Sequence, residues 1–278
     1  MPRQKTSIEI IKDVFWDIFF VAIGTVSEII AISIIVEKPF NPIPLIIAFL
    51  STLTIYLFDF ARDEKDNIHY KSEHKLLASK RIAVLCIIIF SALSALFLAL
   101  RFGSTSGFYI LSIGLILSIL YPIFFKNLTK KIVGFKDFFV AILWNLFIIF
   151  YLAFSNVSFD FGIIILLVVI FLRDFVNANY CDIKDIQEDR EKGLLTIASI
   201  VGKTKLLKFV QALNILSILI ILLFKYTGAL PISTVWLIIP IIFVMIMMAN
   251  SKRAKYSTAI VDSEYVLWAI ILLIYLVL

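Results

Sequence analysis

The stretch Asn179–Gly202, NYCDIKDIQEDREKGLLTIASIVG, is densely acidic and directly follows a long apolar run. Its aspartates at positions 182, 185 and 189 are spaced three and four residues apart, and residues at that spacing stack on one face of a helix. Three stacked carboxylates repel one another unless a cation lies between them. Magnesium prefers oxygen ligands and is commonly held by one or two carboxylates together with substrate phosphates. We therefore predict that Asp182, Asp185 and Asp189 bind Mg²⁺ and, through it, a diphosphate.

A second acidic stretch follows an earlier apolar run. Asp59, Asp63 and Asp66 recur there at spacings of four and three, and Asn67 stands beside them. The oxygen atoms of these side chains are also suitable magnesium ligands. We expect the two acidic segments, at about residues 59–80 and 179–203, to hold one metal-diphosphate between them.

The composition places the whole chain in a membrane. Hydrophobic residues make up 62% of it and the mean hydropathy is +1.03, whereas soluble domains contain roughly 45–50% apolar residues. A membrane helix needs roughly 20 mainly apolar residues. The runs of this kind lie at about 14–36, 42–59, 81–100, 107–125, 134–154, 161–181, 206–224, 230–249 and 262–278. We predict an all-α integral membrane protein with nine transmembrane helices around a central cavity, forming a single domain over residues 1–278, whose first run is retained as a helix.

The distribution of basic residues predicts the orientation of this domain. Lys and Arg next to membrane helices favour the cytoplasmic side. With nine helices and a cytoplasmic N-terminus, all 26 Lys and Arg residues except Lys38, Arg101 and Lys225 fall on that side. The C-terminus then lies outside, and both acidic segments face the cytoplasm. Part of this basic surface is explained by attraction to anionic membrane lipid, and we expect no nucleic acid partner.

Several polar residues fall inside the apolar runs. Glu28 lies deep in the first run, where an acid is costly enough to suggest a function. Two interpretations of Glu28 stay open, a lining residue of the cavity and a hydrogen bond between packed helices. We expect Asn145, Asn177 and Asn179 to turn toward the protein interior as polar residues of the cavity. The last three runs are more uniformly apolar, and we interpret them as scaffold and as walls of an apolar cavity.

Basic residues follow the fourth run, on the side of the acids. Lys126 and Lys136 place ammonium groups there. A diphosphate needs such counter-charges in addition to its metal ion. We therefore predict that Lys126 and Lys136 bind the diphosphate.

At these residues the chain resembles the UbiA-type intramembrane prenyltransferases, a family with nine transmembrane helices and two Asp-rich motifs. The second motif of that family reads approximately DIxDxxxDRxxGxxTLxxxxG. Residues 182–202 resemble it, and the matching positions are Asp182, Asp185, Asp189, Arg190, Gly193, Thr196 and Gly202. The segment Tyr121–Lys126 resembles the family's Tyr-Pro-x-x-Lys segment.

The first Asp-rich motif of the family, usually NDxxDxxxD, is altered in this chain. The best superposition places Asp59 on the Asn, Phe60 on the first Asp, Asp63 on the second and Asn67 on the third. Two of the three acids are therefore replaced, and Asp59 and Asp66 are the candidates to compensate for them.

The resemblance implies magnesium-dependent transfer of a polyprenyl group from a polyprenyl diphosphate to a lipophilic acceptor in the membrane. It implies that Asp63, Asp182 and Asp185 are the catalytic carboxylates and that Arg190 joins the lysines in binding the diphosphate. Nothing in the sequence chooses the acceptor. The altered first motif also leaves cyclisation of a prenyl diphosphate open. Two alternatives from other classes remain, a polytopic transporter whose acids carry ions and a membrane protein that binds an isoprenoid without turning it over.

Overall fold

The computed structural model describes residues 7–63, 81–249 and 257–278, and their secondary structure is entirely helical. The nine membrane helices predicted from the sequence are confirmed, because nine segments of the described residues are long and apolar enough to cross a membrane. The eighth of these segments combines a 3-10 turn with an α-helix. In chain order the elements are α1 (Ser7–Ile35), α2 (Pro42–Asp63), α4 (Arg81–Phe102), α5 (Thr105–Ile123), η1 (Phe125–Lys130), α6 (Phe135–Phe154), α7 (Phe161–Cys181), α8 (Ile186–Glu191), α9 (Ile197–Val201), α10 (Lys203–Tyr226), η2 (Ile232–Leu237), α11 (Ile238–Ala249) and α12 (Ser257–Val277).

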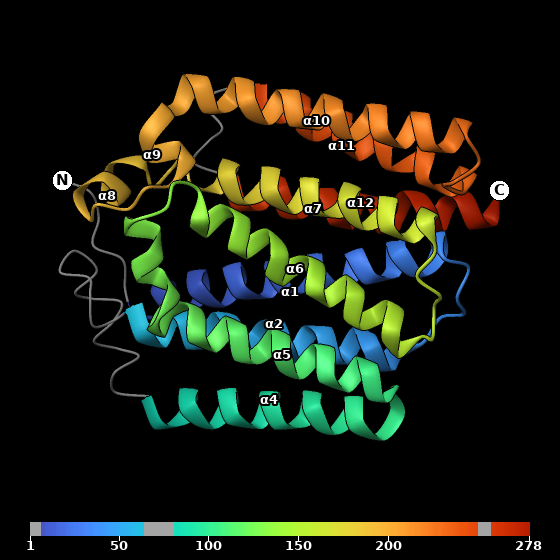
Figure 1. The fold of residues 1–278 in the computed structure, drawn as a ribbon. Helices are drawn as coiled ribbons and strands as arrows, with labels where there is room; N and C mark the ends of the chain where they lie inside the picture. Colours follow the sequence, from blue (N-terminus) through green and yellow to red (C-terminus); the bar gives the residue numbers. More distant parts are fainter. Residues whose placement is uncertain (1–6, 64–80, 250–256) are drawn as a thin grey trace.

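The long helices form a closed ring. Each one packs against the next along the chain, from α1 and α2 through α4, α5, α6, α7, α10 and α11 to α12, and α12 returns to pack against α1. Figure 1 shows the helices running roughly parallel or antiparallel in one bundle. A closed ring of helices encloses an interior, as predicted.

The end of α2, where the first acidic segment begins, and the second acidic segment lie at the same end of the bundle. The end of α2, the turn between α5 and α6, and the short helices α8 and α9 gather at the left of Figure 1, together with the start of α1. The end of α12 lies at the opposite end. We refer to the end that carries Asp182 as the acidic end.

Small residues allow the helices to approach closely, as expected where lipid supplies no hydrophobic driving force between helices. Ala95 and Ala99 of α4 are fully buried. The hydroxyl groups of Thr54 on α2 and Ser91 on α4 lie 2.7 Å apart and form a hydrogen bond between the two helices.

Large apolar side chains fill the half of the bundle away from the acids. Trp268 of α12, Ile148 of α6 and Ile170 of α7 are completely buried in this core. These three core residues lie farther from the acidic end than the residues of the same helices that line the cavity described below. The core therefore closes the interior at that end.

Candidate active site

The second acidic segment is not one continuous helix. α7 ends at Cys181, a turn follows, and α8 begins only at Ile186. The prediction that one helical face carries all three aspartates is therefore wrong. Asp182 is the C-cap residue of α7 and Asp185 is the N-cap residue of α8, where its side chain makes no capping hydrogen bond.

A short loop folds the segment back onto the bundle. Gly193 has a positive φ of 69° and ends α8, a position where glycine is favoured. The backbone N–H of Leu195 then donates to the carbonyl of Thr129 at 2.8 Å, and its own carbonyl accepts from the N–H of Gly134 at 2.8 Å. Gly134 has a φ of 68° and precedes the first residue of α6. These bonds fix the start of α6 against the acidic segment.

The start of α6 supplies the cation of the site. Lys136 donates from Nζ to Oδ1 of Asp182 at 2.7 Å, so residues 46 positions apart form an ion pair. The next residue, Asp137, is 1% exposed. It accepts from the backbone N–H of Ile197 at 3.3 Å, at the start of α9. The two neighbouring side chains therefore hold α6 to both ends of the acidic segment.

The other two aspartates of the segment lie close enough to Asp182 to feel its charge. Burial raises the pKa of Asp185 to about 6, although Lys184 and Lys136 oppose the shift. Burial also raises the pKa of Asp189, and Lys136 again opposes this. Asp189 accepts a hydrogen bond from the hydroxyl of Thr196 at 2.9 Å. Burial makes the charged form of these carboxyl groups unfavourable, and a bound cation would stabilise that charged form.

Two cavities open beside Lys136. The larger has a volume of about 230 Å³ and is lined by α1, α2, α6, α7 and α12, with Asp137 and Asp182 at its acidic end. The smaller cavity has a volume of about 170 Å³ and lies between α2, α5 and α6. Its lining is mainly apolar but also includes Asp59 and Tyr121. The cavities share the side chains of Tyr56, Lys136, Val140 and Trp144. They therefore adjoin one another, with Lys136 on their common wall.

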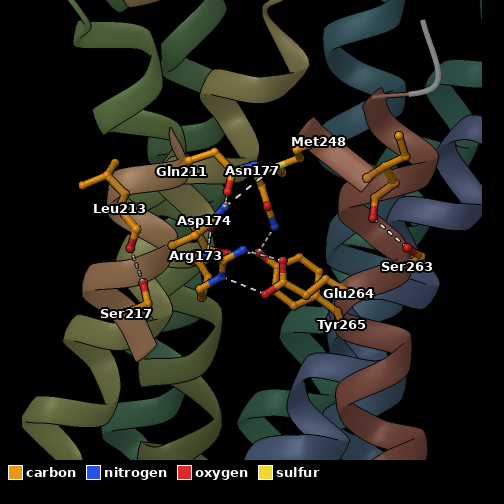
Figure 2. Close-up of polar contacts among 12 residues, drawn as sticks. Arg173, Asp174, Asn177, Gln211, Leu213, Ser217, Met248, Ser263, Glu264 and Tyr265 are labelled. Carbon is orange, nitrogen blue, oxygen red and sulfur yellow. Dashed lines mark hydrogen bonds and ion pairs between the residues drawn. The ribbon is translucent and has the colours of Figure 1, made fainter. Parts of the chain in front are cut away.

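A polar cluster lies at the inner end of the larger cavity. On each helix that contributes to it, the cluster includes the lining residue that lies farthest from the acidic end. Its members are Glu28 on α1, Asp174 and Asn177 on α7, and Tyr265 on α12. The phenol of Tyr265 donates to Oδ1 of Asp174 and accepts from Nδ2 of Asn177 at 2.8 Å. Figure 2 shows these three side chains turned toward one another.

A buried ion pair holds α12 beside this cluster. Arg173 donates from Nε to Oε1 of Glu264 at 2.7 Å and from Nη2 to Oε2 at 2.6 Å, and both residues are fully buried (Figure 2). The third guanidinium nitrogen donates to Asn214 of α10. A bidentate pair fixes geometry as well as charge. It joins α7, α10 and α12 behind the cavity wall.

The other residues predicted from the sequence lie in different places. Asp59 is exposed and lines the smaller cavity, and Glu28 and Asn177 line the larger one. Asn145 donates to the carbonyl of Leu167, and Asn179 donates to the carbonyl of Phe175 in its own helix. Neither side chain lines either of these two cavities.

Two predicted diphosphate ligands lie away from the cavity lining. Arg190 is exposed and donates to the carbonyl of Ser199 at 2.7 Å. Lys126 is partly exposed on η1 and lines neither cavity. The backbone of Asp63 ends α2, but its side chain lies outside the described residues, as do Asp66 and Asn67.

The donor atoms at the acidic end fit magnesium by their chemistry. They are hard carboxylate oxygens, and Oδ2 of Asp182 is buried and has no hydrogen-bond partner among the described residues. Within the described ranges, no group of three His, Cys, Asp or Glu side chains is arranged to hold a metal ion. Asp182, Asp185 and Asp189 are the residues here that would hold magnesium.

The sequence interpretation placed Asn177 in the cavity and gave cavity lining as one interpretation of Glu28, but it missed Asp174 and Tyr265. Asp174, Asn177, Cys181 and Asp182 are spaced three, four and one residue apart, and they lie on one face of α7 and line the cavity. That periodicity was readable in the sequence. The ion-pair partner of Arg173 could not be predicted from the sequence, because Glu264 lies 91 residues away.

Comparison with known proteins identifies the family. The sequence model of the protein family described as "UbiA prenyltransferase family" matches residues 57–270, which is most of the chain. The chain belongs to the UbiA prenyltransferase family. No protein of curated function matches the sequence significantly.

Solved structures show that this member has the UbiA fold. The apo structure of a UbiA homologue from Aeropyrum pernix K1 superposes with a TM-score of 0.69 at 14% identity, covering 95% of this chain and 98% of the other. A UbiA homologue from Archaeoglobus fulgidus bound to GPP and Mg²⁺ gives a TM-score of 0.66 at 12% identity, covering 96% and 98%. A digeranylgeranylglyceryl phosphate synthase gives 0.61 at 20% identity, covering 93% and 98%.

Proposed function

We propose that this UbiA member transfers a polyprenyl group from a polyprenyl diphosphate to a lipophilic acceptor within the membrane, with Mg²⁺ as its cofactor. One observation carries the proposal. The Lys136–Asp182 ion pair lies at the acidic end of a cavity that continues between apolar helices, and the charges of both residues act on the buried Asp189. This combination of charge and apolar walls suits a molecule with a diphosphate head and a hydrocarbon chain.

The residues of the acidic end bind the diphosphate in this proposal. Asp182, Asp185 and Asp189 hold Mg²⁺, and Asp59 together with Asp63, Asp66 or Asn67 completes the site from the first acidic segment. The bound ion supplies positive charge that neutralises the diphosphate as it leaves. Support comes from the fold, because A. fulgidus homologues of the same fold were solved with DMAPP or GPP and Mg²⁺.

Lys136 supplies further positive charge at the same place. Its ammonium group already lies on the wall shared by the two cavities. Preorganised cations stabilise negative charge that develops on a leaving group. Lys136 therefore binds the diphosphate and stabilises its departure, and Lys126 and Arg190, which lie outside the lining, contribute long-range charge.

The two cavities divide the substrates between them. The smaller one is mainly apolar, with Leu143 and Phe147 in its wall, and accommodates the start of the prenyl chain. Departure of diphosphate leaves an allylic cation, which the aromatic faces of Tyr56 and Trp144 stabilise. The apolar core beyond the cavity excludes water that would otherwise capture the cation.

The acidic end faces the cytoplasm in this proposal, because the sequence assigns most Lys and Arg residues to the side of the membrane that carries the second acidic segment. Both substrates enter a site that is open to cytoplasmic Mg²⁺ and buried in the membrane.

The test is transfer by purified protein in detergent. Geranyl, farnesyl and geranylgeranyl diphosphates are each supplied with Mg²⁺, with and without a membrane lipid extract, and products are identified by mass. We expect prenylated products that need both Mg²⁺ and extract. Mg²⁺-dependent donor binding without any product would indicate a non-catalytic isoprenoid-binding protein, and a cyclised product formed without extract would indicate a cyclase.

A further inference from the structure

We propose that Phe147 limits the length of the prenyl chain that this protein takes. The inference rests on the proposed function, which places the start of the prenyl chain in the smaller cavity. It adds to that function a residue that determines specificity for the donor. The observations that carry it concern the apolar wall between α5 and α6.

The smaller cavity has a charged end and an apolar end. Asp59 and Lys136 line it near the acidic end of the bundle, and Phe147 lines it deeper along α6. Phe147 follows Lys136 by eleven residues, which at a rise of 1.5 Å per residue is roughly 16 Å along the helix axis. A donor whose diphosphate lies beside Lys136 therefore directs its hydrocarbon chain toward Phe147.

A second apolar space lies directly beyond Phe147. This deeper space has a volume of about 10 Å³ and lies between α5 and α6, farther from the acidic end. Ser118, Leu143 and Phe147 line both the deeper space and the smaller cavity. The two are therefore neighbours, and the ring of Phe147 lies at their boundary.

Packing holds the ring of Phe147 in this place. Its residue is 7% exposed, and its ring contacts the indole of Trp144 with the ring centroids 5.6 Å apart. It also belongs to the core between α2, α4, α5 and α6, which includes Leu111 and Phe150 of the deeper wall. A close-packed core resists the insertion of further carbon atoms. Phe147 therefore forms a floor that the prenyl chain meets.

The deeper space suits hydrocarbon. Among the described residues that line it, Ser118 is the polar one, and its hydroxyl donates to the carbonyl of Gly114 at 2.8 Å within α5. Gly114 leaves room there, because the nearest atom that an added Cβ would meet is Cβ of Leu146, at 4.0 Å. A further isoprene unit that entered this space would bury apolar surface, which is favourable.

Removal of the Phe147 ring joins the two spaces. Phe147→Ala deletes a whole aromatic ring, and a core relaxes only partly around such a deletion, so that a cavity remains. The joined cavity extends from Lys136 past Gly114. A donor with a further isoprene unit then fits without displacing the packed core, and longer donors gain relative to shorter ones.

The test is a competition between donors of different length. Geranyl, farnesyl, geranylgeranyl and geranylfarnesyl diphosphates are supplied together, with Mg²⁺ and a membrane lipid extract, to the purified protein in detergent. The consumption of each donor is followed by mass and gives the ratios of their kcat/KM values directly. These ratios do not depend on the folded fraction of the sample, so a loss of stability in a variant leaves the test valid.

For Phe147→Ala we expect kcat/KM of at least one of the three longer donors, relative to geranyl diphosphate, to rise by about tenfold or more, the discrimination that a single misfitting methylene causes in an apolar pocket. Phe138→Ala is the matched control, because it makes the same change on the same helix in a residue that is 51% exposed and lines neither space. It should change no ratio.

A second variant tests whether the deeper space is the cause. Gly114→Leu fills that space, and leucine is more favourable than glycine in a helix. Combined with Phe147→Ala, it should reverse most of the gain for longer donors. Gly114→Leu alone should leave the ratios unchanged, because the chain stops at Phe147 in the wild type.

The outcomes separate this inference from the proposed function. Mg²⁺-dependent consumption with the same ratios in the wild type and in Phe147→Ala overturns the inference and leaves the diphosphate site standing. A gain for longer donors that Gly114→Leu does not reverse also overturns it. Absence of Mg²⁺-dependent consumption of every donor by the wild type overturns the proposed function, and the inference with it.

Discussion

The ammonium nitrogen of Lys136 lies 2.7 Å from Oδ1 of Asp182, and this ion pair ties the first turn of α6 to the end of α7 at the acidic end of the cavity. Asp182 is nearly buried, with a side chain that is 6% exposed, whereas the side chain of Lys136 is 30% exposed. The lysine is the more accessible partner, so a diphosphate that enters the site competes for its ammonium group.

Replacing Lys136 tests this role. Lys136→Met keeps the aliphatic stem and removes the charge, so we expect KM for the prenyl diphosphate to rise at least tenfold, the cost of one charge-assisted contact of about 1.4 kcal/mol or more. Lys131→Met is the matched control, because Lys131 is exposed on the same side of the bundle. Equal KM values for the two variants in a diphosphate-release assay would contradict the assignment.

The raised pKa of Asp185 predicts a pH dependence of metal binding. A carboxyl group must lose its proton to bind a metal ion, and burial keeps Asp185 protonated up to about pH 6. Affinity should therefore fall by about tenfold per pH unit below that value. Titration with Mn²⁺ followed by electron paramagnetic resonance measures this slope. Asp185→Asn should reduce this slope to the part that Asp189 contributes, and Glu188→Gln should leave it unchanged.

The same shift has an opposite effect on the stability of the metal-free protein. The folded chain holds the Asp185 proton up to about pH 6, whereas the usual pKa is 3.8. The folded state therefore binds more protons within this window, and the free energy of unfolding should fall as the pH rises from about 4 to 6. A rise across this window that Asp185→Asn leaves unaltered would contradict the burial of this group.

Much of this architecture could be predicted from the sequence, because the bilayer imposes one length and one hydropathy on every membrane helix. The nine helices and the second Asp-rich motif were readable for that reason. The break in the helix at Asp182 could not be predicted, because spacings of three and four suit both a continuous helix and two helices joined by a turn. Only the folded chain shows that the loop after α8 turns back, where the backbone N–H of Leu195 donates to the carbonyl of Thr129.

The character of α12 also differed from expectation. Its mostly apolar run predicts scaffold and the wall of an apolar cavity. α12 does line the larger cavity, but its polar residues face inward, where Glu264 pairs with Arg173 and Tyr265 donates to Asp174. A polar residue in an apolar run can face a neighbouring helix or a cavity. The sequence does not say which, since the partners lie on a helix 91 residues away.

The pair of Arg173 and Glu264 predicts a large effect on stability. Arg173→Met leaves a buried carboxylate without its partner, so we expect a loss of about 3–5 kcal/mol in the free energy of unfolding. Arg173→Met combined with Glu264→Leu should recover most of that loss, because no charge then remains buried. Unfolding in mixed detergent micelles measures both.

The control for this series is Arg101→Met, the same change in an exposed residue at the end of α4. If its loss of stability equals that of Arg173→Met, the buried pair does not have the predicted importance.

The first acidic segment is tested by separate changes at its two candidate compensating residues. Asp59 lines the smaller cavity beside Lys136, so Asp59→Asn is expected to raise the Mg²⁺ concentration needed for half-maximal diphosphate release by tenfold or more. Asp66→Asn shows whether Asp66 shares this role. If neither variant alters the Mg²⁺ requirement, the first segment does not contribute to the metal site.

The measurement that tests the central claim most directly is the release of diphosphate from geranylgeranyl diphosphate as Mg²⁺ is titrated, in the wild-type protein and in Asp182→Asn. Glu188→Gln is the control, an acid of the same segment whose side chain is 40% exposed and paired with Lys192. We predict Mg²⁺-dependent release by the wild type and by Glu188→Gln, and a loss of at least a hundredfold in Asp182→Asn. Release by Asp182→Asn at the wild-type rate, or release by the wild type without Mg²⁺, would contradict the assignment of this site.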